Sequence, residues 1–379
     1  MNISIFNLLL IAGVIQGFVF NIVTLINRKK ISKVIIFLNL TVFFLSLNNL
    51  QAWLIESGYS SNIFFIKKLL VPWYMLIFPM FYMFLINYLK VKDQLKNILK
   101  ISLAIFCVQL LIRILLISYV FYYKTDLRDS LISDYNSVEE IFNAVFGFLI
   151  VFKSSYLVFK QKEVYDYVLK FDDIKWIKIF LILGGVIIFF WVFAIVIQNI
   201  NGNKFAYYPL RLSTSVLLYW IGYQGLYRYN ILNDRISLRH SLNSDLQPIL
   251  GSNIGSLEIE VKDYISEKHQ QDFNLINDYV LNNQKFLDSY LSMDNLSNEL
   301  NMSTSHFSKI VNGLSGYNFS DYINSFRVEQ AKKLLSDEAF DKYTIVAIGL
   351  ECGFNSKSTF YNAFKKFTLQ TPTQFRSKN

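Results

Sequence analysis

The chain has 379 residues, enough for two domains, and 53% of them are hydrophobic, with 35 Phe and 24 Tyr. Its mean hydropathy of +0.32 is high for a soluble protein of this size, and its net charge of +9 fits an anionic partner, positive cytoplasmic loops, or both. Three histidines and two cysteines show no metal-ligand spacing, and the GxSxG, HExxH and P-loop motifs are missing. We therefore expect no enzyme, no metal site and no cofactor.

Apolar stretches long enough to cross a bilayer, about 20 residues each, follow one another through the first 229 residues. The first is expected to be retained as a span, because it exceeds the length of a signal peptide and no small-residue cleavage site follows it. Pro72 and Pro79 in the third are compatible with a kinked span. About seven spans are expected, at 3–27, 34–55, 69–89, 98–120, 141–159, 177–198 and 209–227.

Basic residues in the short loops predict the orientation of these spans. The loops after the first, third and fifth spans hold twelve Lys and Arg, whereas the other loops and span ends hold five. The basic loops are therefore expected on the cytoplasmic side. With an odd number of spans, the N-terminus lies outside and everything after Tyr227 lies inside. The expected location is the inner (cytoplasmic) membrane, with membrane lipid as a partner.

Arg113 is a charged residue within the fourth span, where a charge is costly unless it faces the bundle interior or a partner. The second span carries the polar residues Asn48, Asn49 and Gln51, with Glu56 at its outer end. One hypothesis is a sensor pocket that opens outward between these two spans, where Arg113 pairs with Glu56 or with an unknown anionic ligand. The alternative is a structural arginine that bonds to helix carbonyls or reaches the outer headgroups.

A polar connector is expected after the last span, because Pro248, Gly251 and Gly255 predict turns there. It is either a solvated spacer or a dimerising helix, and in the second case a further copy of the chain is a partner. The expected division of the chain is a transmembrane domain at 1–229, a cytoplasmic linker at 230–272 and a C-terminal domain at 273–379.

Two helix-turn-helix patterns occupy the C-terminal domain. In the first, Ser303 can cap a helix that begins at Thr304. In the second, Gly353 permits the turn and Ser356 can cap the helix that follows. An amphipathic helix is expected to link the two patterns. Such a pattern alone is a weak signal, because many all-α domains match it.

The amino-acid sequence of this region is far more specific than the pattern. The segments LSNELNMSTSHFSKIVN, GYNFSDYINSFRVEQAKKLL, TIVAIGLECGFNSKSTFYNAFKKF and TPTQFR resemble the DNA-binding domain of the AraC/XylS family over about 95 residues, a quarter of the chain. Seven spans before such a domain resemble the membrane-bound AraC-type regulators of Bacteroidetes-like bacteria. Gly349 and the run 368–370 depart mildly from the family pattern. The resemblance implies an all-α fold, a multi-span bundle followed by two helix-turn-helix units.

The same resemblance implies which residues touch DNA, because in that family the second helix of each unit enters a major groove. The residues expected to contact bases are Ser305, Ser308 and Lys309 in the first unit and Lys357, Ser358, Tyr361 and Asn362 in the second. Lysine can donate to guanine, and asparagine can pair with adenine. The alternative is that these residues are the solvent faces of two short helices.

Four further basic residues are candidates for phosphate contacts: Arg327, Lys365, Lys366 and Arg376. Arg327 could equally pair with an acidic neighbour. Residues 285–379 hold eleven basic and nine acidic residues, so nonspecific affinity is expected to be modest and salt-sensitive.

The resemblance therefore implies a membrane-anchored, sequence-specific transcription regulator that couples a membrane or external signal to promoter binding. Its expected partners are double-stranded DNA and RNA polymerase. A receptor or transporter with an accessory C-terminal domain is the alternative. Against it, the expected spans show no internal repeat, and Arg113 is the one clear candidate for an intramembrane charge.

Overall fold

The computed structural model of the chain describes residues 5–26, 32–57, 64, 68–91, 97–123, 128–201, 207–245 and 267–377. Within these ranges every regular element is a helix, which confirms the all-α expectation for the described residues. The chain divides into two compact units, Met1–Tyr229 and Asn230–Asn379, and each is described by itself.

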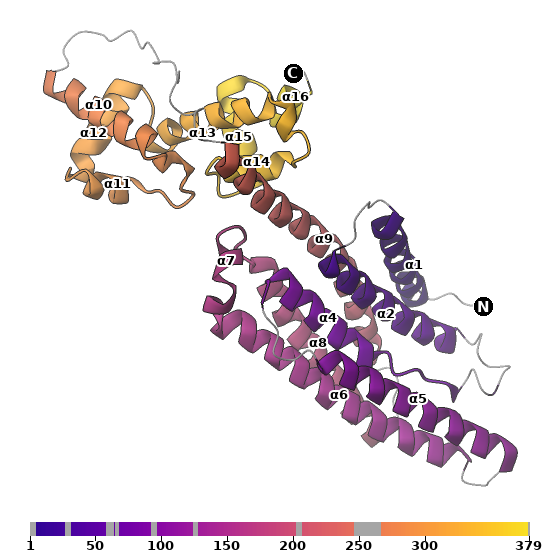
Figure 1. The fold of residues 1–379 in the computed structure, drawn as a ribbon. Helices are drawn as coiled ribbons and strands as arrows, with labels where there is room; N and C mark the ends of the chain where they lie inside the picture. The colour runs from indigo at the N-terminus through magenta and orange to yellow at the C-terminus, as the bar shows by residue number, and fades with distance from the viewer. Residues whose placement is uncertain are drawn as a thin grey trace. The chain divides into compact units, whose positions relative to one another are not determined.

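The first unit consists mainly of long apolar helices, drawn from indigo to magenta in Figure 1. They are α1 (Ile5–Ile26), α2 (Lys33–Glu56), α4 (Tyr74–Tyr88), α5 (Ile98–Tyr123), α6 (Arg128–Lys160), the short η1 (Lys162–Tyr165) and α7 (Asp166–Leu169), α8 (Lys175–Asn201) and the first part of α9 (Tyr207–Asp245). Helix α6 begins well before the expected start of the fifth span at residue 141. Much of the expected 121–140 loop is therefore helical.

Helix α4 is the central element of this unit and packs against α2, α5 and α6. Most of its side chains are buried, and Pro79 lies inside the helix without ending it. Gly147 of α6 allows a close approach to α4. A Cβ at this position would lie only 2.5 Å from the ring of Phe78. Neighbouring helices thus cover α4, whereas those around it keep an outer apolar face.

Those outer faces leave many large apolar side chains exposed, among them Ile22 on α1, Leu115 on α5 and Phe189 on α8. By length and composition alone, five of the described helices could cross a membrane: Leu8–Ile26, Lys33–Ile55, Ile98–Tyr123, Ser130–Lys160 and Lys175–Ile200. Helix α4 is apolar but shorter. The expected number of about seven spans is therefore not established and stays a prediction.

The second unit holds the end of α9 and a series of shorter helices. They are α10 (Glu267–Asn282), η4 (Lys285–Leu287), α11 (Met293–Glu299), α12 (Thr304–Ser315), α13 (Phe319–Leu335), η5 (Glu338–Phe340), α14 (Ile345–Glu351), α15 (Lys357–Thr368) and α16 (Pro372–Arg376). Residues 230–245, which the sequence predicts as part of a turn-rich connector, are helical. The turn-forming residues on which that prediction depended lie outside the described residues.

Two hydrophobic cores organise the second unit, and α13 contributes to both. Its first half places Tyr322, Ile323 and Phe326 in a core with α10, α11 and α12. Its second half places Val328, Ala331, Leu334 and Leu335 in a core with α14 and α15. A single helix that is buried at both ends links the two helix-turn-helix units without a flexible joint between them.

Candidate nucleic-acid interface

The first helix-turn-helix unit is formed by α11 and α12. Asn301 lies in the turn with φ of 55°, a left-handed conformation that asparagine tolerates better than most residues. Ser303 then caps α12, because its side chain accepts a hydrogen bond from the amide of His306. The buried side of α12 carries Phe307, Ile310 and other apolar residues, and this leaves the opposite side of the helix to solvent.

On that solvent side lie the residues that the resemblance implies. Ser305 and Lys309 are exposed, and Ser308 is partly exposed. Asn312, which sequence reasoning did not select, is exposed on the same face, and its Nδ2 lies 3.4 Å from Ser308 Oγ. Its position three residues after Lys309 could have indicated it. His306 of the same helix is partly buried, and its Nε2 lies 2.9 Å from Asp272 Oδ2 of α10, so its contact is within the domain.

The second helix-turn-helix unit is formed by α14 and α15 in the same way. Gly353 lies in the turn with φ of 95°, and the side chain of Ser356 accepts from the amide of Thr359 to cap α15. Phe360 and Phe364 are buried on one side of α15. Both expected N-caps are therefore present, and each orients a short amphipathic helix with one polar face.

The polar face of α15 carries Lys357, Ser358 and Asn362, all exposed. Tyr361 is half-buried, because its hydroxyl lies 3.2 Å from Thr373 Oγ1 of α16 and its ring lies beneath the Lys357 ammonium at 5.5 Å. The C-terminal helix thus orients this tyrosine. Thr359 is a further exposed residue on α15 that sequence reasoning did not select.

Arg327 on α13 is partly buried and forms hydrogen bonds within the domain. Its Nε donates to the carbonyl of Phe286 at 2.7 Å, and another guanidinium nitrogen donates to the carbonyl of Asp288, also at 2.7 Å. Burial lowers the pKa of Arg327 to about 10. A Cβ on Gly353 would lie 2.3 Å from the same Phe286 carbonyl. Arg327 and Gly353 therefore join the first helix-turn-helix unit to the second helix-turn-helix unit. A phosphate contact by Arg327 would have to replace these hydrogen bonds.

The other three phosphate candidates differ in their surroundings. Arg376 donates to the Tyr343 carbonyl at 2.9 Å, and burial lowers its pKa. Lys366 forms an ion pair with Asp321 at 2.7 Å but keeps 57% of its side chain exposed. Lys365 is exposed on α15. The two lysines are thus more accessible to an anionic backbone than the two arginines.

The proposed sensor residue Arg113 is 2% exposed in the first unit. Its guanidinium pairs with the carboxylate of Glu139 and donates to Asn136 Oδ1 at 2.7 Å, while Gln109 one turn earlier donates to Asn143 at 2.9 Å. Glu139 precedes the expected start of the fifth span at residue 141, and the hypothesis drawn from the sequence paired Arg113 with Glu56 instead. Because α6 begins at Arg128, the partner that the structure gives Arg113 is Glu139. The side chain of Glu56 lies outside the described residues.

The polar residues of α2 do not meet Arg113 in their described contacts. Asn48 lies 3.3 Å from the Tyr74 hydroxyl of α4, and Asn49 donates to Ser215 of α9 at 3.2 Å. Gln51 accepts from the amide of Val71 at 2.9 Å. The polar pocket expected between the second and fourth spans is not formed by these contacts.

Comparison with known proteins agrees with this geometry. Residues 296–378 match the family model of a helix-turn-helix domain. An uncharacterized HTH-type transcriptional regulator of Staphylococcus aureus strain MSSA476 is 40% identical over 86 residues, which are 23% of this chain and 11% of that protein. Another from Staphylococcus aureus is 37% identical over 86 residues. The C-terminal part of the chain therefore carries an AraC-type helix-turn-helix domain of the kind found in transcription regulators.

Two solved structures also match. A Listeria innocua protein of unknown function is 25% identical, with 28% of this chain and 95% of that one covered and a TM-score of 0.25. The C-terminal domain of AraT, a response regulator from Geobacillus stearothermophilus, is 23% identical, with 31% and 89% covered and a TM-score of 0.25. This chain spans about a tenth of the length of the curated relatives that it matches.

Proposed function

We propose that the chain is a membrane-anchored transcription regulator of the multi-span AraC type found in Bacteroidetes-like bacteria, and that it binds specific promoter sequences. The helix-turn-helix pair supports the DNA-binding half of the proposal. One observation carries the membrane half: several long helices of the first unit expose large apolar side chains along their length. Exposure of such faces to water is energetically unfavourable, whereas their exposure to the hydrocarbon core of a bilayer is favourable.

The contacts to DNA follow from the polar faces of α12 and α15. Lys357 and Asn362 are proposed to read base edges in one major groove, and Ser305 and Lys309 in the adjacent one. Lys365 and Lys366 are proposed to contact phosphates. A second copy of the chain, RNA polymerase and a signal ligand are proposed as further partners, with the second unit in the cytoplasm.

Cell fractionation and chromatin precipitation of the intact protein test this proposal together. The protein is expected in the membrane fraction, and its precipitation is expected to enrich a small number of promoters. A Lys357→Ala/Asn362→Ala variant of equal abundance should lose that enrichment. Membrane localisation without any enriched promoter would favour the receptor or transporter alternative. Enrichment by a protein found only in the soluble fraction would refute the anchor.

A further inference from the structure

The end of α9 packs against the second helix-turn-helix unit, although more than a hundred residues separate the partners in sequence. Within the second unit, Asp234 Oδ2 accepts from the backbone amide of Thr344 at 3.0 Å, and Ser241 Oγ lies 2.9 Å from the hydroxyl of Tyr343. The segment 230–245 is therefore a structural part of this unit, and the sequence-based description of it as a linker misses these contacts.

The carboxylate of Glu351 at the end of α14 is the main polar anchor of the contact. It is 3% exposed and accepts from Arg235 Nε at 2.7 Å and from Arg239 Nε at 2.8 Å. The two arginines are four residues apart and so lie on the same face of α9. A buried carboxylate that loses its cations is strongly destabilising, so Glu351 makes the fold of α14 depend on α9.

The charges on α9 also match the dipole of α14. Thr344 is the N-cap of α14, and the acidic Asp234 lies at that end. The basic Arg235 and Arg239 lie at the C-terminal end, where cations are favourable. Helix α14 has only seven residues, too few to be stable without neighbours. Both of its ends are thus held by side chains of α9.

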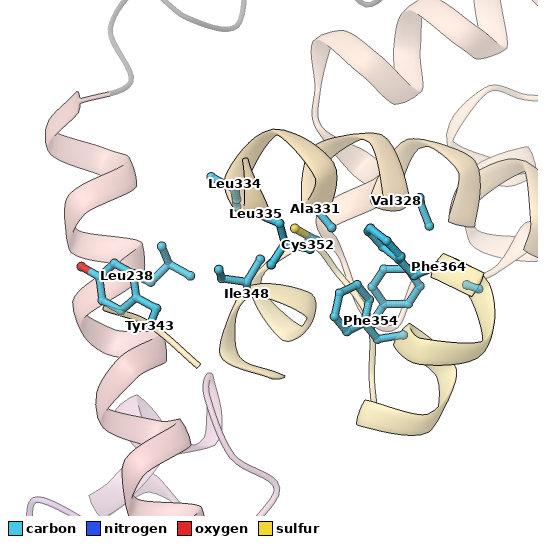
Figure 2. Packing of buried hydrophobic residues seen from close by; sticks show 12 residues of the cluster. Leu238, Val328, Ala331, Leu334, Leu335, Tyr343, Ile348, Cys352, Phe354 and Phe364 are labelled. Carbon is cyan, nitrogen blue, oxygen red and sulfur yellow. The ribbon is translucent and has the colours of Figure 1, made fainter. Parts of the chain in front are cut away.

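Between these polar contacts, Leu238 of α9 is fully buried in the same core as Ile348 and Cys352 of the α14 turn (Figure 2). That core continues to Phe360 and Phe364 on the inner side of α15. Withdrawal of α9 would therefore open a hole beside α14 and loosen the packing beneath the second recognition helix.

The two helix-turn-helix units differ in the origin of the helix that supports them. The first core receives Ile276 and Val280 from α10, which lies wholly inside the second unit. The second core receives Leu238 from α9, whose first part belongs to the apolar unit. Of these two supports, α9 alone is a helix that, among the described residues, also extends into the apolar unit.

We propose that residues 230–245 are a control contact for the second helix-turn-helix unit. While they are docked on α14, α15 keeps the shape that binds DNA, and a signal that withdraws them releases the second recognition helix but not the first. The proposal rests on the proposed function, because it assigns the regulation of that same DNA-binding domain. The partner of the α14 surface is this segment of the same chain.

The test compares full-length protein in lipid nanodiscs with an Arg235→Gln/Arg239→Gln variant, and hydrogen exchange is the first measurement. Amides in α14 and α15 should exchange about tenfold or more faster in the variant, because Glu351 is left without its cations. Amides in α12 should be unchanged. A His240→Gln variant, changed at an exposed position of the same segment, should match the wild type. Equal exchange in α14 for all three proteins would overturn the proposal.

A second measurement separates control from simple stability. Adding Glu351→Gln to the double variant removes the unpaired charge and should restore most of the protection of α14. Footprinting on a recovered promoter should then show the double variant protecting one half-site and losing the other, with the triple variant intermediate. Loss of both half-sites together would overturn the selective release that we propose. If the wild type protects no promoter, the proposed function fails, and the exchange measurement still decides whether α9 holds α14.

Discussion

Asn362 and Lys357 illustrate what a single position on α15 can contribute. Both are exposed, while Phe360 and Phe364 of the same helix are buried, so a substitution on the exposed face removes a potential DNA contact without opening the core. Tyr361 differs, because its hydroxyl is near Thr373 of α16. Its replacement would disturb the protein as well as any contact with DNA.

Asn362→Ala is expected to weaken binding to the preferred duplex by roughly 1–3 kcal/mol and to relax the preference at one or two base positions. The reason is that a side-chain amide can form two hydrogen bonds with an adenine edge, whereas alanine can form none. Anisotropy titrations against a set of singly substituted duplexes would measure both effects. Asn282→Ala, at an exposed position at the end of α10, is the control. An unchanged preference in the α15 variant would contradict the assignment.

Gly353→Ala is expected to destabilise the junction between the two helix-turn-helix units by at least about 2 kcal/mol. The backbone there has φ of 95°, and the new Cβ would lie 2.3 Å from the Phe286 carbonyl and 2.9 Å from Arg327 Nε. Hydrogen exchange of amides in α13 to α15 would report the loss.

Gly313→Ala is the matched control for that substitution. A Cβ added there would meet no atom within 4 Å, and the position lies in the last turn of α12. Alanine should therefore stabilise the helix by about 0.5–1 kcal/mol. Equal effects of the two substitutions would show that the close approach at Gly353 is not a constraint.

Individual elements of the second unit could be predicted well from the sequence because their signals are local. Ser303 and Ser356 mark the two helix starts, and the apolar periodicity gives the buried faces. The contact of α9 with α14 could not be predicted, because Arg235 and Glu351 are far apart in sequence and each is by itself an ordinary charged residue. For a similar reason the sequence did not predict that the helix of the last expected span, 209–227, continues to Asp245. Leu238 is buried by a tertiary contact that periodicity does not reveal.

The same limit applies to α5 and α6 in the first unit. Sequence reasoning identified Arg113 as unusual because an isolated charge in an apolar stretch is rare. It did not find Glu139, because the run of acidic residues before 141 is equally typical of a loop. The structure places Glu139 on α6, and α5 and α6 lie side by side in Figure 1.

The pair Arg113–Glu139 is expected to behave as a unit when α5 and α6 are mutated. Arg113→Leu or Glu139→Leu alone leaves one buried charge, a change that costs about 3–5 kcal/mol in soluble proteins. Each single variant should therefore be less abundant in membranes. The double variant should recover much of that abundance, because no unpaired charge remains. Immunoblotting of membrane fractions gives the measurement.

A promoter reporter on the same variants tests the sensor hypothesis. A double variant of normal abundance that still responds to inducing conditions would exclude a sensor role for the pair. A double variant of normal abundance that no longer responds would support it. A double variant no more abundant than either single variant would show that the ion pair itself, and not the removal of unpaired charge, maintains the fold of α5 and α6.

At the scale of the whole molecule, the proposed function requires a particular topology. The first unit must sit in the membrane with its basic loops inside, and the second unit must have access to DNA. The five helices that are long and apolar enough to cross are an odd number, and so are seven if α4 and the first part of α9 also cross. Both counts lead from an outside N-terminus to an inside C-terminus. Only seven crossings, however, place the basic loops after the third and fifth expected spans inside and residue 126 outside, so the topology to be tested is the one with seven spans.

Fusions of alkaline phosphatase and of a fluorescent protein after residues 126 and 379 test that topology. The first site lies between α5 and α6, and the second follows the DNA-binding domain without interrupting α9. Phosphatase should be active at 126 and inactive at 379, and fluorescence should show the opposite pattern, because phosphatase folds only outside the cytoplasm. The basic loops supply the physical reason for this expectation, since Lys and Arg are retained on the inner side. Phosphatase activity at 379 would place the recognition helices away from the chromosome, and the DNA-binding proposal would then fail whatever the isolated domain can bind.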